Sequence, residues 1–171
     1  MKIKLYILTY NSEYHLNSGL ETLFSTDLSQ HQIEIYVINN HTNYNLYKKF
    51  ENKVITIHNI LQPDFGTGHC SRNWNQAIIH GFHSLINPDC DLVICAQDDT
   101  EYLHNWLNLL VHAHTAGYEF IACGIGDNLC SYTPIGVKYI GLWDERYCAL
   151  HYAEHDYFLR AAMWLLSLIH I

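Results

Sequence analysis

The sequence predicts a single α/β domain with a mostly parallel central sheet and helices on both faces. From the first residues onward, segments rich in β-branched and aromatic residues alternate with segments of helical periodicity. Residues 92–96 are apolar at every position, as expected of a central strand that is buried on both sides. This alternation indicates parallel strands joined by right-handed helical crossovers.

Five strands are predicted, at residues 3–10, 33–40, 54–60, 92–96 and 119–126. Helices are predicted at residues 12–25, 44–51, 70–85 and 103–110, with a further helix within 141–161. Residues 61–69, which contain Pro63, Gly66 and Gly68, are expected to form a loop.

A chain of 171 residues is long enough for one domain, which we expect to span residues 1–164, with 165–171 as a tail. The net charge of −8 argues against nucleic-acid binding, which needs a basic surface. None of the six cysteines forms a C-x-x-C pair, and no apolar run reaches transmembrane length. With no signal peptide at the N-terminus, these features predict a cytoplasmic protein, peripheral to a membrane at most.

Polar residues follow three of the predicted strands at the point where each ends. They are the segments Thr9–Asn11, Asn39–Asn40 and Gln97–Asp99. Because ligands bind at the carboxyl ends of parallel strands, we expect these segments to converge on one ligand-binding edge.

The adjacent acids Asp98 and Asp99 have two interpretations. Two carboxylates at a strand end are suitable ligands for Mg²⁺ or Mn²⁺, which are commonly held by one or two acids and substrate phosphates. Alternatively, either acid caps the first turn of the next helix.

Two further segments carry candidate functional residues. Arg72 is a possible fork for phosphate or carboxylate, although the loop before it lacks the ending of a Walker motif; the alternative is a solvated helix face. Glu154 and Asp156 are two residues apart, so on a helix only one of them faces a given site, where a carboxylate can act as a general base. Asp156 and Arg160 are also at the spacing of a helical ion pair.

The order and spacing of five segments resemble the family 2-like glycosyltransferases with the GT-A fold, which is Rossmann-like. The segments are ILTYNS, VINNHT, SRNWNQA, AQDDTEYLHNWL and GLWDERY…HYAEHDYFLRA, and they span almost the whole chain. The resemblance implies a set of donor-binding residues: Thr9, Tyr10, Asn11, Asn39, Arg72, Asn73 and Asp98.

The resemblance also assigns roles to the acids. Gln97-Asp98-Asp99 occupies the position of the metal-binding DXD motif, so Asp99, with Asp98, is implied to hold Mn²⁺ or Mg²⁺. Glu154 is at the position of the catalytic base, and Asp156 is the reserve candidate. The acceptor side corresponds to Trp143, Asp144 and Glu145.

The chain departs from the family pattern at four places. One is the acidic cluster, usually Glu-Asp-x-Asp, whose first two positions are Ala153 and Glu154 here. Asn39 and Gln97 stand where most members carry acids, and the apolar tail stands where the family's domain usually continues, as in a truncated chain.

The function implied is transfer of a sugar from a nucleotide-sugar donor (UDP-, GDP- or dTDP-linked) to a hydroxyl of a glycan, lipid-linked or protein acceptor. One metal and one base suit a single displacement that inverts the anomeric centre. The alternatives are a catalytically silent nucleotide-sugar-binding domain, a purely structural module and a sugar-1-phosphate nucleotidyltransferase. The last of these ranks low, because no N-terminal glycine-rich loop with Arg and Lys is present.

Overall fold

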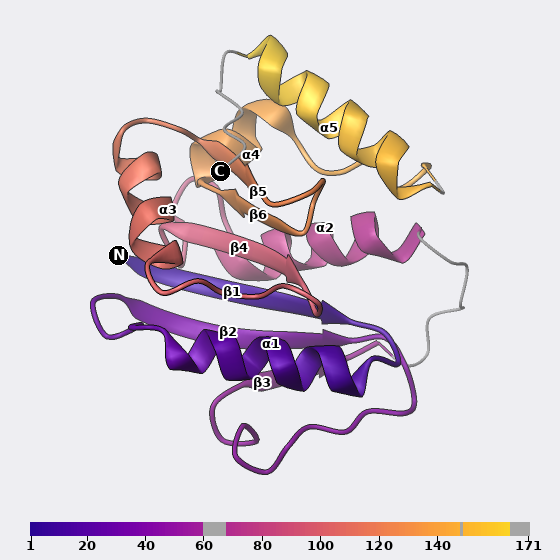
Figure 1. The fold of residues 1–171 in the computed structure, drawn as a ribbon. Coiled ribbons are helices and arrows are strands. Elements are labelled where there is room, and N and C mark those ends of the chain that lie inside the picture. The colour runs from indigo at the N-terminus through magenta and orange to yellow at the C-terminus, as the bar shows by residue number, and fades with distance from the viewer. Residues whose placement is uncertain (60–67, 148, 165–171) are drawn as a thin grey trace.

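The computed structural model describes residues 1–59, 68–147 and 149–164, and these residues form the predicted α/β architecture (Figure 1). The strands are β1 Lys2–Thr9, β2 Gln32–Asn39, β3 Ile55–His58, β4 Leu92–Gln97, β5 Phe120–Cys123 and β6 Leu129–Tyr132. The helices are α1 Glu13–Ser25, α2 Gly68–Phe82, α3 Trp106–Thr115, α4 Pro134–Ile140 and α5 Leu150–Met163.

The strands form one sheet in the order β3-β2-β1-β4-β6-β5. The pairs β1–β2, β1–β4 and β2–β3 are parallel, whereas β6 is antiparallel to both β4 and β5. The register pairs Thr9 with Asn39 and Leu8 with Gln97, so β1, β2 and β4 end at the same edge of the sheet. We call this edge the rim; it contains Thr9, Asn39 and Gln97–Asp99.

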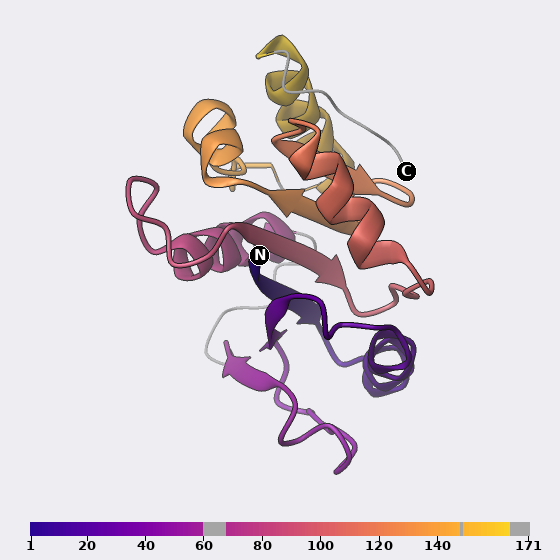
Figure 2. The same ribbon diagram turned by 90° about the vertical axis from the view of Figure 1, so that its left-hand side faces the viewer.

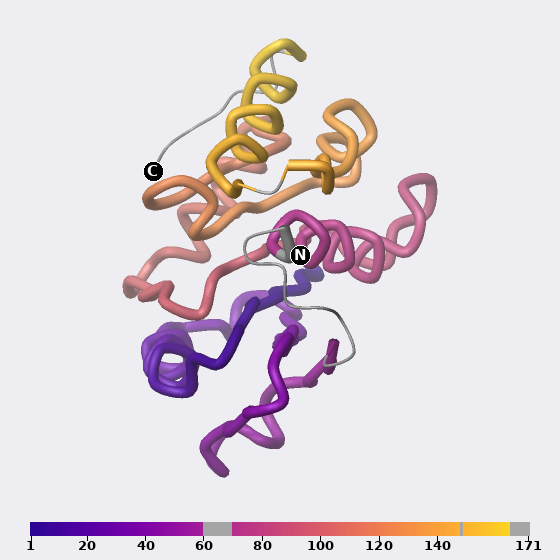
Figure 3. The backbone as a smooth tube through the Cα atoms, turned by 90° about the vertical axis from the view of Figure 1, so that its right-hand side faces the viewer, coloured from indigo at the N-terminus to yellow at the C-terminus, as the bar shows by residue number. Residues whose placement is uncertain are grey.

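Helices cover both faces of the sheet, as Figures 1 and 2 show. Ile3, Leu5 and Ile7 of β1 share one buried cluster with residues of α1 and α3. The alternate residues Tyr6 and Leu8 belong to a second cluster, with residues of α2, α4 and α5. This alternation is the period of two that the pleat of a strand imposes. In Figure 3, α4 and α5 lie on one side of the molecule, while α1 and β3 lie on the other.

The predicted helix at 44–51 is wrong, because residues 44–47 have no regular secondary structure and residues 48–51 form turns. Oδ1 of Asn17 accepts a hydrogen bond of 2.9 Å from the Tyr47 N–H, and its Nδ2 donates one of 3.1 Å to the Asn45 carbonyl. These backbone groups are therefore held by a side chain of α1. Phe50 is buried and stacks on Phe24, which anchors the turn in the core.

The predicted strand at 119–126 is too long. β5 ends at Cys123, and the chain then turns through Gly124 and Gly126, whose φ angles of 84° and 65° are in the region that glycine favours. The chain returns as β6, which the sequence did not predict.

The ends of two helices also differ from the prediction. α2 ends at Phe82, and His83 has a φ of 60°, so Leu85 lies outside the helix. α3 begins only at Trp106, so Leu103 precedes it and is exposed. Residues 60–67, Cys148 and the tail 165–171 lie outside the described residues.

Candidate functional site

Asp98 and Thr9 are brought together at the rim by the pairing of β1 with β4. Since Leu8 is opposite Gln97, the next residues of the two strands are neighbours. The Thr9 hydroxyl donates a hydrogen bond of 2.7 Å to Oδ2 of Asp98, and the backbone of Tyr10 also donates to this carboxyl. The first predicted donor residues therefore surround the first acid of the pair.

The electrostatics of this acid pair favour a cation. Burial raises the pKa of Asp98, and the charge of Asp99 raises it further, while the hydrogen bond from Thr9 lowers it. Asp99 is exposed at the surface. A bound divalent ion would relieve the repulsion between the two carboxylates. The alternative role as a helix cap is wrong, because α3 begins at Trp106 and Asn105 occupies its N-cap position.

Asp98 and Asp99 are the chemically suitable ligands for Mn²⁺ or Mg²⁺. In residues 1–59, 68–147 and 149–164, no three His, Cys, Asp or Glu side chains are grouped as a metal site. Two carboxylates at a strand end nevertheless fit the usual arrangement for these ions, in which phosphates and water complete the coordination.

A polar cavity of about 560 Å³ lies beside the carboxyl ends of β1 and β2. Its lining residues are Asn11, Glu13, Thr42, Asn43, Tyr44 and Asn45. Asn11 has a φ of 48°, a left-handed conformation that asparagine tolerates at turns. Tyr10 is exposed and packs edge-on against His41, with ring centroids 5.0 Å apart.

Three of the predicted donor-binding residues are buried, namely Thr9 and the two asparagines Asn39 and Asn73. Nδ2 of Asn39 donates 2.8 Å to the His41 carbonyl and contacts Nδ1 of His58 at 3.1 Å, while its Oδ1 accepts from the His41 N–H. Asn73 on α2 is also buried, and its Oδ1 accepts a hydrogen bond of 3.1 Å from Asn59. In this structure both asparagine side chains form hydrogen bonds inside the protein.

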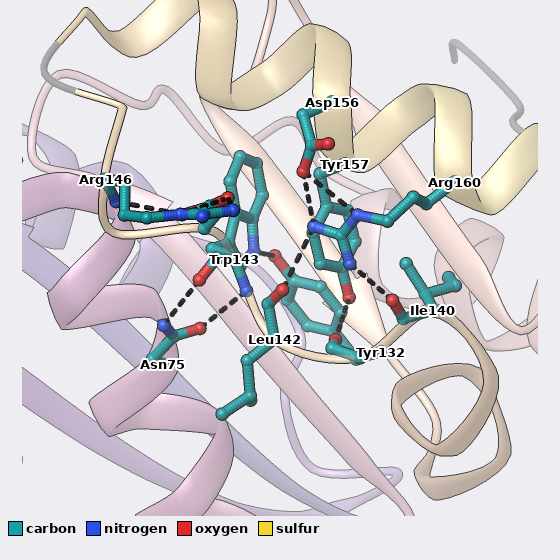
Figure 4. A network of polar contacts seen from close by, with 11 residues as sticks. Asn75, Tyr132, Ile140, Leu142, Trp143, Arg146, Asp156, Tyr157 and Arg160 are labelled. Atoms are coloured by element: carbon teal, nitrogen blue, oxygen red, sulfur yellow. Dashed lines mark hydrogen bonds and ion pairs between the residues drawn. The ribbon is translucent and has the colours of Figure 1, made fainter.

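Arg72 contacts the predicted acceptor-side segment. Its Nε is 3.5 Å from Oε2 of Glu145, and both side chains are nearly half exposed. Asn75, one turn further along α2, donates 2.9 Å to the other Glu145 oxygen and also bonds the backbone of Trp143 (Figure 4). α2 thereby holds the segment that leads into α5.

Trp143 is buried within this segment. Its ring stacks on Tyr157 at 4.4 Å, and its Nε1 donates a hydrogen bond of 3.0 Å to the Tyr132 hydroxyl (Figure 4). Of the three acceptor-side residues, only Asp144 and Glu145 present side chains with exposed surface, and Asp144 is bonded to Arg146.

Glu154 and Asp156 point in different directions from α5, as their spacing predicts. Oδ2 of Asp156 forms the ion pair with Arg160, whose guanidinium also donates to the carbonyls of Ile140 and Leu142 (Figure 4). Oε1 of Glu154 instead accepts a hydrogen bond of 3.2 Å from the backbone N–H of Asp127. Asp156 is therefore committed to a structural pair, whereas Glu154 lies against the β5–β6 turn.

Asp127, which the sequence analysis did not single out, is a central residue of the site. It lies in the β5–β6 turn and is 1% exposed. Its Oδ1 accepts a hydrogen bond of 2.6 Å from Nε2 of Gln97, and its Oδ2 accepts one of 2.8 Å from Nε1 of Trp74. The signal that was available is the Gly-Ile-Gly-Asp-Asn run, whose composition is typical of a turn.

The acids around Asp127 perturb one another. The pKa of Asp127 is raised to about 7. Burial is the largest cause, and the hydrogen bond to Glu154 and the charge of Glu154 act in the same direction, whereas the hydrogen bond from Trp74 lowers the pKa. The thiol of Cys70 on α2 has a pKa raised to about 12, by burial and by the charges of Asp127, Glu154 and Asp98. The three carboxyls therefore act on a common region, and Cys70 remains a neutral thiol.

A second, mostly apolar cavity of about 600 Å³ adjoins Asp99. It lies between residues 99–106, α3 and the β5–β6 hairpin, and Leu103, Leu109 and Leu129 are among the residues that line it.

No helix within the part of the chain that the structure describes has the length and apolar character needed to cross a membrane.

Solved structures with similar folds are known, although no family model and no curated protein matches the sequence. The chain resembles residues 1–349 of TarS from S. aureus, with a TM-score of 0.69 and 16% identity over 100% of this chain and 58% of that one. It also resembles the mannosyltransferase PcManGT from Pyrobaculum calidifontis, with a TM-score of 0.67 and 11% identity over 95% of this chain and 52% of the other.

A third similar structure is glucosyl-3-phosphoglycerate synthase from Mycobacterium tuberculosis, with a TM-score of 0.65 and 9% identity over 99% and 69% of the two chains. The likeness to these enzymes shows the GT-A fold and confirms the fold that the sequence resemblance implied. The chain spans little more than half the length of the first two chains.

Proposed function

We propose that this chain is a nucleotide-sugar-dependent glycosyltransferase that transfers a sugar to an acceptor hydroxyl with inversion of the anomeric centre. The observation that carries the proposal is the placement of three carboxylates. Asp98 and Asp99 directly follow β4. Glu154 of α5 is connected to the same strand end, because it bonds to the backbone of Asp127, whose side chain bonds to Gln97. The GT-A fold is consistent with this proposal. A fold alone leaves the function open, so the proposal is argued from the site.

On the donor side, the nucleotide would occupy the polar cavity that includes Asn11, at the ends of β1 and β2. Asp99, with Asp98 held by Thr9, would bind Mn²⁺ or Mg²⁺. When bound, that cation would offset charge on the diphosphate leaving group. Arg72 could add a second positive group beside the phosphates, after exchanging its contact with Glu145.

On the acceptor side, Glu154 is the proposed general base. It would accept the proton of the acceptor hydroxyl while that oxygen bonds to the anomeric carbon and the bond from that carbon to the diphosphate breaks. Asp144 and Glu145 are the proposed acceptor contacts, and the buried Trp143 would hold their segment in place. One base and one displacement give inversion.

Ligands of the similar structures define the panel for a first test. TarS was solved with UDP and with UDP-GlcNAc, PcManGT with GDP-Man and Mn²⁺, and the mycobacterial synthase with UDP. The thermal midpoint of this chain should rise with one nucleotide or nucleotide-sugar of the UDP, GDP and dTDP series, and more so with Mn²⁺. A folded chain whose midpoint no ligand raises would overturn the donor site.

Two variants separate binding from turnover. Asp99→Asn should remove the Mn²⁺-dependent part of the shift, while Glu101→Gln, an exposed acid two residues further on, should preserve it. Glu154→Gln should keep donor binding but lose at least about 100-fold in transfer or donor hydrolysis. Binding by the wild type without any turnover would favour the catalytically silent binding domain.

A further inference from the structure

The backbone of the β5–β6 turn is in direct contact with Glu154. The Asp127 N–H donates to Oε1 of Glu154 at 3.2 Å. A Cβ added at Gly126 would lie 2.6 Å from the same oxygen, closer than any unstrained contact. Glycine at this position therefore leaves the space in which the Glu154 carboxylate sits.

The side chain of Asp127 extends from the same turn to the rim. It is buried, and both of its oxygens accept N–H donors, from Gln97 at the end of β4 and from Trp74 on α2. A carboxyl group is costly to bury, and two directed donors offset part of that cost. Trp74 is itself 0% exposed, so its indole N–H is a fixed anchor.

The turn is bonded to the rim by its backbone as well. The carbonyl of Asn128 accepts hydrogen bonds from the Gln97 N–H at 2.9 Å and from the Thr100 hydroxyl at 3.0 Å. The residues on either side of Asp98 and Asp99 are thus attached to the turn that contacts Glu154. A displacement of the turn would change the separation between these acids and Glu154.

We propose that Gly126 and Asp127 are positioning residues of the reaction site, which hold Glu154 and the segment Gln97–Asp99 at a fixed separation. The roles of Glu154 as base and of Asp98 and Asp99 as metal ligands rest on the proposed function. The contacts that connect these residues through the β5–β6 turn do not depend on it. Misplacement of a base by about 1 Å can reduce turnover about 100-fold, so such a link has a direct catalytic consequence.

A matched pair of glycine variants tests the contact with Glu154. Gly126→Ala introduces a Cβ against the carboxylate. Gly117→Ala is the control, because Gly117 has a φ of 100° and its added Cβ meets nothing within 4 Å. Both variants carry the strain of a left-handed alanine, but only the first touches Glu154.

The first measurement is independent of turnover. In the full chain labelled with ¹³C-glutamate, the Glu154 carboxyl resonance is assigned with Glu154→Gln. Gly126→Ala and Asp127→Asn should shift this resonance, and Gly117→Ala should leave it in place. An unshifted resonance in both site variants, or an equal shift in the control, would overturn the proposal.

The second measurement is a split between kcat and donor KM at matched folded fractions. Gly126→Ala should lower kcat about 100-fold with little change in donor KM, because the displaced group acts on the acceptor. Ser131→Ala, which breaks a buried hydrogen bond of 2.7 Å to His114 away from the site, should keep the wild-type kcat. If Asp127→Asn does not fold, Trp74→Phe removes one donor to Asp127 and should show a smaller loss of the same kind.

The two proposals fail in different ways. If the wild type shows no turnover but Gly126→Ala still shifts the Glu154 resonance, the transferase function is overturned and the link stands. If Glu154→Gln loses activity while Gly126→Ala retains the wild-type kcat, the function stands and the positioning role is overturned.

Discussion

The Thr9 hydroxyl donates a 2.7 Å hydrogen bond to Oδ2 of Asp98 across the boundary between β1 and β4. This bond lowers the pKa of Asp98, against the effects of burial and of Asp99. Thr9→Val keeps the shape of the side chain and removes the donor, so the pKa of Asp98 should rise further. We expect Mn²⁺ binding in the presence of the nucleotide to weaken about tenfold, and more at lower pH, by titration calorimetry.

The matched control is Thr115→Val. Thr115 is exposed at the end of α3, and its hydroxyl donates a hydrogen bond to the Val111 carbonyl of the same helix. Its loss should leave the Mn²⁺ affinity unchanged. Equal affinities of the two variants would show that the Thr9 bond has no part in holding the cation.

The raised pKa of Asp127 predicts a pH-dependent contribution to stability. Its carboxyl titrates near 7 in the folded chain, against 3.8 for the ordinary group. Between these values the folded state holds the proton more tightly than the unfolded state, so this contribution to the unfolding free energy falls as the pH rises from about 4 to 7. Groups that share this environment include Glu154, Cys70, Cys95 and Cys130.

Asp127→Asn isolates that contribution, because the amide does not titrate. The difference in thermal midpoint between the wild type and Asp127→Asn should shift against the wild type between pH 4 and pH 7. A constant cost is expected in addition, since the amide cannot accept from both Trp74 and Gln97. A difference that stays the same across this range would contradict the raised pKa.

The central parallel strands β1, β2 and β4 were predictable because most of their residues are buried. β1 and β2 each have eight residues rich in β-branched and aromatic side chains, and the first five residues of β4 are all apolar and buried. β5 and β6 have four residues each, and the glycines between them continue an apolar run. The strand predicted at 119–126 therefore runs past β5 into the turn, and β6 is not predicted.

For the same reason, some residues of the candidate site were predictable and others were not. Residues at the ends of parallel strands, such as Thr9, Asp98 and Asp99, could be placed at one rim from the order of the strands alone. Asp127 lies instead in the turn of an antiparallel hairpin. Its partners Trp74, Gln97 and Glu154 are 53, 30 and 27 residues away, so only the folded chain brings them together.

Gln97 stands where the resembling family commonly has an acid, and Asp127 gives a physical reason for the amide. Its Nε2 donates to Oδ1 of Asp127 at 2.6 Å, which a carboxylate could not do. Gln97→Glu should therefore lower the unfolding free energy by about 1–3 kcal/mol at pH 8, where repulsion replaces the hydrogen bond.

Asp127→Asn provides the second side of a double-mutant cycle. In the double variant, the new amide can donate to the new carboxylate, so the combined loss should be smaller than the sum of the single losses. Denaturant unfolding of the four proteins measures this coupling. Additive losses would show that Gln97 and Asp127 do not interact energetically.

The commitment of Asp156 to Arg160 leads to a prediction that separates stability from catalysis. Arg160 donates to Asp156 at 2.7 Å and to two backbone carbonyls before α5, and its guanidinium packs over the Tyr157 ring at 4.9 Å. Arg160→Met should lower the unfolding free energy by about 2 kcal/mol, because these partly buried acceptors lose a charged donor. Arg146→Met is the control, since the Arg146 side chain is 91% exposed, and it should change stability little.

The ion pair between Asp156 and Arg160 also gives a test of which acid, Glu154 or Asp156, is the general base. If Asp156 has a structural role in its pair with Arg160, Asp156→Asn should retain kcat within about threefold at a temperature where this variant is folded. Glu154→Gln should lose most of its kcat. Steady-state rates at saturating donor make the comparison. Loss of kcat in a folded Asp156→Asn, with Glu154→Gln near wild type, would move the base to Asp156 and require that its pair with Arg160 opens before the acceptor binds.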